Sequence, residues 1–462
     1  MYFATLRGLI KKMYSEISLR NYQQDIFDKA IQAFKDGAKG ICCVLPCRSG
    51  KSYIMARMIK GAKGNVLVLA HRHTLINQHK ELLKGLGVLT DKVRVESVFT
   101  EASRLGKYAK DSINLIIIDE AHLSEALSYR KVCEYYNCRR VLFTATPARL
   151  DGKPLTLADT LITGITATKL IKLGAISDYD YYAPDLNLDI EKVDMVAGEY
   201  NNGQLTEIMC QTAIYGDVLK YYQQLGENRQ AIAYCTSVKH SEQTAKMFCD
   251  NGISAISIDG SMSQKERNKK MNMFRSGDVQ ILCNCNLISE GVTLPNASVA
   301  LLLRPTMSLP LFIQQACRVL TPVVGKKAVI IDFVNNVQKH GMPTDTHNWS
   351  LTQFVEKRKE FNEDGTLNIR QCKNCFKCFK TAPKCPYCGY EYTVKGRELK
   401  SVQDVELKKI EAIQREEQEK QKKNARREQG MCKSYQELFE LAKKRGYKNP
   451  SGWAYFIMKG RR

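Results

Sequence analysis

The residues best suited to catalysis lie between Ile116 and His122, where an apolar run ends in Asp119, Glu120, Ala121 and His122. Four consecutive apolar residues before Asp119 predict a buried strand, so two adjacent carboxylates would stand at its exit. In this position Asp119 can hold Mg²⁺ and Glu120 can orient an attacking water for phosphoryl transfer. The pattern predicts nucleotide hydrolysis if a phosphate-binding loop accompanies it.

Such a loop precedes the carboxylates, because Pro46–Ser52 follows the apolar run Gly40–Leu45 and contains Gly50-Lys51-Ser52. Backbone N–H groups and the start of the next helix make an anion site there. Lys51 can meet the β- and γ-phosphates, while the Ser52 hydroxyl joins Asp119 on Mg²⁺. ATP and Mg²⁺ are therefore the expected cofactors. The expected contacts in the loop are Arg48, Ser49, Gly50, Lys51 and Ser52.

Three weaker signals surround this pair. Gln23 lies upstream of the loop and could read an adenine edge, or it could simply be a polar helix start. His71 and Arg72 end an apolar run with two cationic-capable side chains, which could also be an ordinary basic loop. Thr144 and Thr146 end another run, and their hydroxyls could bond to the Asp119–His122 segment and relay the nucleotide state.

The elements that would position these residues alternate short apolar runs with stretches of helical spacing over 1–175. This alternation predicts a parallel sheet flanked by helices. The expected strands are Gly40–Leu45, Asn65–Ala70, Val93–Val98, Ile113–Ile118 and Arg140–Thr144. The pattern restarts over 176–350 without a phosphate loop, with Gln230–Cys235, Ile253–Asp259, Val279–Asn284, Ser298–Leu303 and Ala328–Phe333 as strands. An α/β chain with two tandem lobes is expected, and their cleft would hold the nucleotide.

A cysteine-rich segment over 365–395 follows the second lobe. Two Cys-x₂-Cys pairs at this separation are typical of a tetrahedral Zn²⁺ site, here a zinc ribbon. The expected ligands are Cys372, Cys375, Cys385 and Cys388. Cys378 is a fifth cysteine, so Cys375 and Cys378 form an alternative first pair. Basic residues around the cluster favour a contact with nucleic acid, but a purely structural role stays open.

The remainder, 396–462, is predicted to be a basic helical tail. The charged stretch 400–430 reads as a solvated helix, Ser434–Lys444 as a short amphipathic helix, and Trp453 with Tyr455 as part of a small core. No apolar run approaches the length of a membrane span or of a signal-peptide core. Together with seventeen cysteines, most of them scattered in apolar strands, this predicts a cytoplasmic protein.

The formal net charge of +22 predicts a polyanionic partner, most plausibly nucleic acid. A basic surface that only confers solubility is the alternative. Charge alone does not separate these two interpretations.

The order of the motifs resembles the superfamily-2 helicases. In the first lobe it runs through Gln23, Gly50–Ser52, His71-Arg72, Asp119–His122 and Thr144–Thr146. In the second lobe, Asn286–Pro295 resembles the fifth motif of that superfamily and Gln314–Arg318 its sixth. With the later cysteines, the layout is similar to DEAH-type helicases such as bacterial RadD and related phage-encoded helicases.

The resemblance implies two RecA-like lobes and places roles on matching residues. Arg318 would be the arginine finger that reaches across the cleft, and Gln314 would sense the γ-phosphate. Further residues would hold the nucleic-acid backbone or couple it to ATP: His71, Arg72, Ser97, His122, Thr144, Thr146, Thr236, Ser289, Gly291 and Arg304.

Three positions depart from the pattern of the family. Arg48 stands where the phosphate loop usually has Gly, and Thr293 stands where the fifth motif usually has Asp. Thr321 replaces the second arginine of the sixth motif. The rate of hydrolysis therefore becomes the open question, and one hypothesis is that Arg48 supplies the absent positive charge.

The sequence thus predicts an ATP-dependent helicase or translocase. Its expected partner is single-stranded or branched DNA, in replication, recombination or repair. An accessory protein is a further candidate partner. If a phage encodes the chain, the expected location is the cytoplasm of the bacterial host. Two alternatives stay open: an ATP-gated nucleic-acid binding or annealing factor with weak turnover, and the motor subunit of a restriction or nuclease system. DNA versus RNA, polarity and oligomeric state are not determined by the sequence.

Overall fold

The structure is a computed structural model that describes residues 17–147, 154–184, 188, 190–196, 198–285, 294–352, 369–392, 432, 434–445 and 449–459. Some predicted features lie outside these residues, namely Ser289, Gly291, Thr293 and the charged stretch 400–430. Contacts divide the chain into one compact unit, Met1–Glu391, and a second, Tyr392–Arg462.

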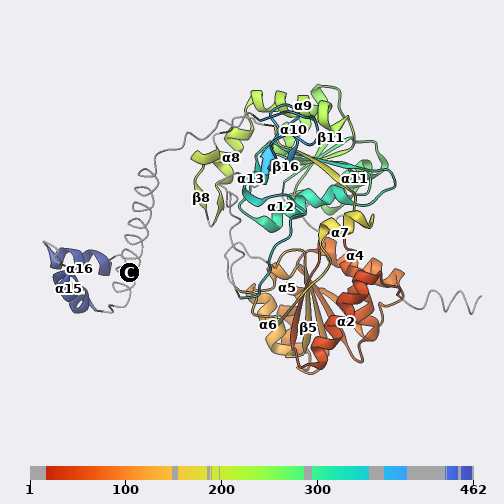
Figure 1. The fold of residues 1–462 in the computed structure, drawn as a ribbon. Coiled ribbons are helices and arrows are strands. Elements are labelled where there is room, and N and C mark those ends of the chain that lie inside the picture. Colours follow the sequence, from red (N-terminus) through yellow and green to blue (C-terminus); the bar gives the residue numbers. More distant parts are fainter. Residues whose placement is uncertain are drawn as a thin grey trace, which may run out of the picture. The chain divides into compact units, whose positions relative to one another are not determined.

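The first lobe is built on a parallel sheet of six described strands in the order β3-β2-β4-β5-β1-β6. Its central strands are buried along their whole length, because helices cover both faces of the sheet (Figure 1). The strands are β1 (Gly40–Val44), β2 (Val66–Ala70), β3 (Val93–Ser97), β4 (Leu115–Asp119), β5 (Arg139–Thr144) and β6 (Thr160–Thr163). The helices are α2 (Asn21–Lys35), α3 (Lys51–Gly61), α4 (His73–Gly85), α5 (Val98–Arg104), α6 (Leu127–Tyr136) and the 3₁₀ turns η1 (Leu105–Lys107) and η2 (Ala121–Leu123).

The second lobe repeats this architecture with another parallel sheet of six described strands, ordered β11-β12-β10-β13-β14-β7. The strands are β7 (Tyr179–Tyr182), β10 (Ala231–Tyr234), β11 (Ala255–Ile258), β12 (Ile281–Asn284), β13 (Val299–Leu302) and β14 (Ala328–Asp332). The helices are α8 (Asn202–Met209), α9 (Thr212–Gly226), α10 (Val238–Asp250), α11 (Gln264–Ser276), α12 (Leu309–Ala316), α13 (Asn336–His340), η3 (Ile190–Lys192) and η4 (Cys317–Leu320). The helix α7 (Ala167–Lys172) precedes β7, and its Leu170 lies in a small apolar cluster that includes Tyr22 of α2. The predicted α/β fold with two lobes is confirmed.

Sequence analysis missed the edge strands β6 and β7, as well as the short antiparallel hairpin β8 (Met195–Val196) and β9 (Glu199–Tyr200). The edge strands read Thr-Leu-Ile-Thr and Tyr-Asp-Tyr-Tyr, without the continuous apolar run that marks a strand buried on both faces. Within the sheets they pair with β1 and β14, respectively, so tertiary pairing rather than local pattern makes them strands.

The cysteine-rich segment contributes the antiparallel pair β15 (Ile369–Gln371) and β16 (Cys378–Lys380). It packs on the second lobe beside β7. The Ala183 N–H donates to the Phe376 carbonyl oxygen at 3.0 Å, and Lys377 Nζ lies 3.1 Å from Asp180 Oδ1. Phe376 also meets the Tyr221 ring edge-on at 5.4 Å. This segment therefore covers the edge of the second sheet.

The second unit contains α15 (Tyr435–Lys444) and α16 (Pro450–Lys459), which pack on each other. Ser434 caps α15 by accepting a hydrogen bond from the Glu437 N–H at 3.2 Å. Leu438, Ala442 and Ala454 form the buried contact. Tyr455 is 64% exposed, so the expectation that it belongs to a small core is wrong: it lies on the outer face of α16. None of the described helices combines the length and apolar character needed to cross a bilayer.

Candidate active site

The phosphate loop and the paired carboxylates emerge at the same edge of the first sheet. The loop follows β1, and Asp119 ends β4; both strands pair in parallel with β5, which lies between them. Neighbouring strands are about 4.8 Å apart, so the two strand ends lie roughly 10 Å from each other. A nucleotide triphosphate with its metal ion can span this separation, as ligands commonly do at the carboxyl edge of parallel sheets.

Gly50 and Gln23 determine the shape of the phosphate loop. Gly50 has φ +79°, and a Cβ there would come within 2.5 Å of Gln23 Nε2. The Gln23 amide donates to the Ser49 carbonyl oxygen at 2.9 Å, and its Oε1 accepts from the Arg20 N–H at 2.9 Å. The sequence left open whether Gln23 reads adenine or is a polar residue at a helix start; in the structure its amide hydrogen-bonds to the loop, and contact with adenine stays a prediction. Lys51 Nζ donates to the Leu45 carbonyl oxygen at 3.4 Å, inside the curve of the loop.

The two carboxylates after β4 differ in environment. Asp119 is 8% exposed; its Oδ1 accepts from the Glu120 N–H at 3.0 Å, and its Oδ2 lies 3.1 Å from His79 Nε2. Glu120 is half-buried with φ 58°, a left-handed backbone that is costly for a residue with a side chain and is often found at functional sites. Its Oε2 lies 3.4 Å from His122 Nδ1. Both oxygens of Asp119 therefore have a partner, and the Glu120 carboxylate lies beside His122.

Asp119 is ionised at neutral pH. Burial opposes the ionised form, but the hydrogen bond with His79, the charge of His79 and the charge of Lys51 outweigh it and keep the pKa of Asp119 below its usual value. An ionised carboxylate is an acceptor only and a suitable oxygen ligand for Mg²⁺.

The second lobe brings its sixth-motif residues to the same place through α12 and η4. Gln314, which is 7% exposed, donates from Nε2 to Glu120 Oε2 at 3.4 Å. Arg48 Nη2 donates to the carbonyl oxygen of Arg318 at 3.4 Å. These pairs are separated by 194 and 270 residues in the chain. The structure thus joins Gln314 to Glu120, and Arg318 to the phosphate loop.

Positive charge is concentrated where these groups meet. Arg48 has φ 64°, so the chain holds a strained backbone at a position where glycine would be relaxed. Burial, followed by the charge of Arg318, lowers the pKa of Arg48 to about 10. The pKa of the Cys47 thiol is lowered to about 6, mainly by its hydrogen bond with Cys317. The nearby positive charges add to this effect, and together these causes outweigh burial; the charges are those of Lys51, Arg318 and Arg48. Such a potential favours an anion between the lobes.

The predicted nucleic-acid and coupling residues lie at the carboxyl ends of strands. His71 and Arg72 follow β2, with Arg72 Nε donating to His71 Nε2 at 3.2 Å. The Thr144 hydroxyl donates to the Thr146 carbonyl oxygen at 2.8 Å and accepts from the Thr146 N–H at 3.0 Å. These two threonines therefore hydrogen-bond each other, while a bond to Asp119–His122 was the possibility that the sequence raised.

Two predicted coupling residues of the second lobe, Thr236 and Arg304, are buried. Thr236 follows β10 and bonds through Oγ1 to His240 Nδ1 at 3.0 Å. Arg304 follows β13 and is 7% exposed, and its carbonyl oxygen accepts from Asn336 Nδ2 at 3.2 Å. Both stand at the carboxyl edge of the second sheet, as His71 and Arg72 do in the first.

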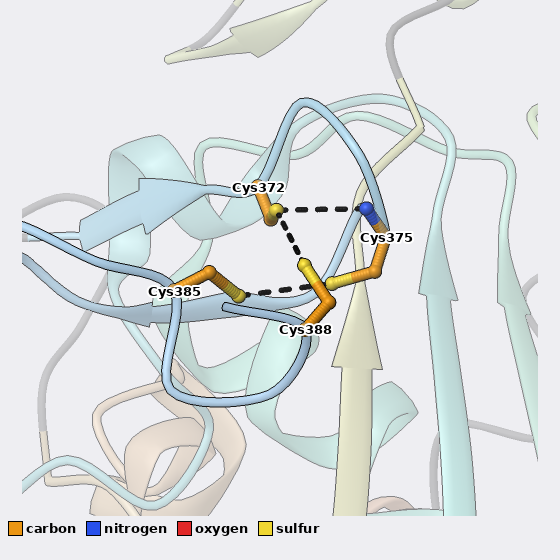
Figure 2. A group of neighbouring side chains, drawn as sticks. All are labelled: Cys372, Cys375, Cys385 and Cys388. Carbon is orange, nitrogen blue, oxygen red and sulfur yellow. Dashed lines mark hydrogen bonds between the residues drawn. The ribbon is translucent and has the colours of Figure 1, made fainter. Parts of the chain in front are cut away.

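The cysteines of the ribbon converge on one point (Figure 2). Among the described residues, the sulfurs of Cys372, Cys375, Cys385 and Cys388 lie within 4.8 Å of one another. Cys378 is not among them: it is 2% exposed, belongs to the core of the second lobe and has its pKa raised by burial. Of the two pairings that the sequence left open, the geometry therefore favours Cys372 and Cys375.

Sequence analysis did not identify His79. It lies in α4 on the same side as the buried Leu75, Ile76 and Leu83, and is itself 6% exposed. A histidine on the apolar face of an amphipathic helix is usually a packed core residue, so only its position against Asp119 reveals another use. The signal available in the sequence was its place two turns after Arg72.

Comparison with known proteins agrees with this geometry. Residues 16–149 match the family described as type III restriction enzyme, res subunit, and residues 210–321 match the helicase conserved C-terminal domain. A 51.5 kDa protein of a Lactococcus phage is 36% identical over 71% of this chain and 72% of its own length. “Putative ATP-dependent helicase IRC3” of Saccharomyces cerevisiae is 30% identical over 71% of this chain, but only 53% of that protein is covered.

Among solved structures, a fragment assigned to the HsdR subunit of a type I restriction enzyme from Vibrio vulnificus has the same fold. The TM-score is 0.57, with 18% identity over 73% of this chain and 67% of that one. At this identity the likeness concerns the fold alone. It agrees with the two-lobed architecture described above.

Proposed function

The chain belongs to the superfamily-2 helicases, and we propose that it is an ATP-driven helicase or translocase of the DEAH subtype, close to RadD, that moves along DNA. The observation that carries this proposal is the contact of Gln314 with Glu120 at 3.4 Å. A residue of the second lobe there touches the side chain that would orient the attacking water. Closing and opening of the cleft can then be tied to hydrolysis.

The chain's own groups support the following roles. The loop at Gly50, with Lys51 and Ser52, would bind the phosphates, and Ser52 with Asp119 would hold Mg²⁺, which supplies charge stabilisation and orientation when bound. Glu120 would orient water toward the γ-phosphate. Arg318 and Arg48 would stabilise the negative charge that develops on that phosphate.

The carboxyl edges of both sheets offer a path for a nucleic-acid backbone. His71 and Arg72 would contact it from the first lobe, and Thr236 and Arg304 would contact or support it from the second. We propose the same for Ser289 and Gly291, which lie outside the described residues. Contacts of this kind read the backbone and imply little sequence specificity. DNA is favoured by the match of residues 16–149 to a restriction-enzyme subunit family, and the phage relative favours the bacterial host cytoplasm as the place of action.

The test is ATP turnover by the full chain with single-stranded, duplex and branched DNA and with matched RNA. We expect the largest stimulation by single-stranded or branched DNA, because backbone contacts on one strand would drive closure of the cleft. Turnover that no nucleic acid increases would contradict the motor. Equal stimulation by RNA would remove the DNA preference alone.

Binding of single-stranded DNA is expected to weaken steeply with salt. Three phosphate contacts on a single strand would lower the affinity roughly tenfold or more between 50 and 200 mM salt. Fluorescence anisotropy with a labelled oligonucleotide measures this slope. A flat salt dependence would contradict backbone binding, whatever the ATPase activity. The double variant His71→Ala with Arg72→Ala should show a shallower slope than the wild type.

A second candidate function is the motor subunit of a restriction or nuclease system, which the match of residues 16–149 specifically favours. That role requires a separate nuclease subunit as a protein partner. Pull-down of the full chain from the host with mass spectrometry distinguishes it from a motor that acts alone. An annealing factor with weak turnover would instead pair complementary strands without consuming ATP.

We also propose that Cys372, Cys375, Cys385 and Cys388 bind one Zn²⁺. Four convergent thiols are a donor set that this ion prefers, and their spacing fits a tetrahedral site. Metal binding would stabilise a short segment that has little core of its own. Because this segment covers the edge strand β7, zinc would also stabilise the second lobe.

Replacing Cys385 by serine is expected to remove the zinc and lower the melting temperature by roughly 5–10 °C, the shift that about 2–3 kcal/mol produces in a domain of this size. The bonds of Phe376 and Lys377 to the β7 region would loosen with the ribbon. Metal analysis and calorimetry measure the two effects. Cys249→Ser, which changes an exposed thiol of the same lobe, is the control and should alter neither. Full zinc content in Cys385→Ser would refute the proposed ligand set.

A further inference from the structure

His79 is a buried histidine that contacts the carboxylate expected to hold Mg²⁺. Its Nε2 lies 3.1 Å from Asp119 Oδ2, and the ring is 6% exposed. The other carboxylate oxygen, Oδ1, accepts from the Glu120 N–H at 3.0 Å. Each oxygen of Asp119 thus has a partner, so the orientation of this carboxylate depends on His79 as well as on the backbone.

The direction of this hydrogen bond follows from the charge of Asp119. A carboxylate that binds Mg²⁺ is ionised, and an ionised carboxylate can only accept a hydrogen bond. His79 must therefore donate from Nε2. A donor on this oxygen orients the carboxylate in the way that outer-shell groups orient metal ligands in other proteins.

The helix that carries His79 begins beside the predicted nucleic-acid contacts. His71 and Arg72 directly precede α4, which starts at His73. His79 follows six residues later, about 9 Å along the helix axis. Leu75, Ile76 and Leu83 are buried in the core of the first lobe, so α4 is held along its length and can transmit a shift at its start to His79.

We propose that His79 is a positioning residue that couples the nucleic-acid-binding end of α4 to the Mg²⁺ site by holding Asp119. This inference rests on the proposed function for the identity of the two ligands, and it assigns the link between them. Nucleic acid bound at His71 and Arg72 would stabilise one position of α4. In that position His79 would hold the Asp119 carboxylate in a fixed orientation. The affinity of the site for the Mg²⁺ nucleotide would then increase.

The experiment measures how much Mg²⁺ tightens the binding of a fluorescent ATP analogue, by titrating the full chain with and without the ion. Two polar variants separate the hydrogen bond from burial. His79→Gln places an amide N–H near the position of Nε2, whereas His79→Asn is one methylene shorter and falls short of Asp119. We expect His79→Asn to lose about tenfold or more of the Mg²⁺-dependent gain, the range seen when outer-shell partners are removed. His79→Gln should retain most of it.

Affinity without Mg²⁺ should be unchanged in both variants, because the hydrogen bond of His79 goes to Asp119 and not to the phosphate loop. His73→Asn, an exposed histidine on the same helix, controls for the substitution itself and should keep the full gain. Melting temperatures show whether a variant is folded, and a loss shared equally by His79→Gln and His79→Asn would indicate a packing role and overturn the proposal.

The coupling has its own readout. In the wild type, single-stranded DNA should increase the Mg²⁺-dependent gain, and by reciprocity the Mg²⁺ nucleotide should tighten DNA binding. In His79→Asn, the increase in the Mg²⁺-dependent gain caused by DNA and the tightening of DNA binding caused by the Mg²⁺ nucleotide should decrease by the same factor. The affinity for DNA without nucleotide should equal that of the wild type. A folded His79→Asn with wild-type gain and coupling would refute the inference. Absence of any DNA effect in the wild type would instead count against the proposed function, and the Mg²⁺ titration alone would still decide the role of His79.

Discussion

Replacing Glu120 by glutamine is expected to lower ATP turnover by at least about 10²-fold and to leave ATP binding nearly unchanged. Glutamine keeps the size of the side chain and its capacity to accept a hydrogen bond from Gln314, which lies 3.4 Å away. It loses the negative charge that would orient and polarise the attacking water. The left-handed backbone at Glu120, φ 58°, is equally costly for glutamine, so folding should be retained.

Steady-state phosphate release gives the turnover, and equilibrium binding of a fluorescent ATP analogue gives the affinity. Glu125→Gln is a matched control from the loop that follows, since its carboxylate bonds to Thr156 Oγ1 at 2.7 Å, outside the nucleotide site. That variant should hydrolyse ATP like the wild type. If Glu120→Gln turns over at the wild-type rate, the motor mechanism fails.

The second large effect concerns the two arginines that meet between the lobes. Arg318→Ala is expected to lower turnover about 10³-fold, the lower end of the range for arginine fingers. Arg48→Gly should lower it by roughly 10²-fold, comparable to removing one preorganised donor. In the proposed mechanism both guanidinium groups would stabilise charge that appears only in the transition state, so the affinity for ATP should change by a few-fold at most.

Glycine is the informative replacement at position 48. The residue has φ 64°, a conformation that glycine adopts freely and alanine does not. Arg48→Gly therefore removes the charge while relaxing the backbone, and it restores the residue usual at this point of the loop. Arg48→Ala would mix loss of charge with strain, and a lower melting temperature than that of Arg48→Gly would reveal the strain.

A double variant tests whether both arginines stabilise charge on the same phosphate. If they do, Arg48→Gly in the Arg318→Ala background should cost less than it does in the wild type, because effects of residues that act as a unit are not additive. If the fold loss in ATP turnover of the double variant equals the product of the two single losses, the arginines have separate roles. Unchanged turnover in Arg48→Gly would show that Arg48 does not replace the second arginine, where the chain has Thr321.

Local patterns in the sequence were sufficient for the two-lobed architecture and for placing the predicted phosphate-site residues at strand ends. Runs such as Ile116–Ile118 and Gly40–Val44 are apolar along their whole length because both faces of a parallel sheet are covered. The loop at Gly50–Ser52 and the carboxylates Asp119 and Glu120 follow directly from such runs, so their position at a strand end is a local property.

Local sequence patterns did not predict the edge strands, and they did not show whether the fifth cysteine belongs to the thiol cluster. The strand β7 reads Tyr-Asp-Tyr-Tyr and becomes a strand through its pairing with β14. Cys378 has the same spacing from Cys375 as Cys375 has from Cys372, and only packing into the core of the second lobe separates it from the thiol cluster.

The contacts that would make the site work depend wholly on the tertiary structure. Gln314 meets Glu120 and Arg48 meets Arg318 across separations of 194 and 270 residues. His79 meets Asp119 from a helix whose sequence marks it as an ordinary core position. Residue types and strand ends follow from short-range periodicity, which the sequence alone carries. Which side chains touch follows from how two sheets and their helices pack, and no local pattern carries that information.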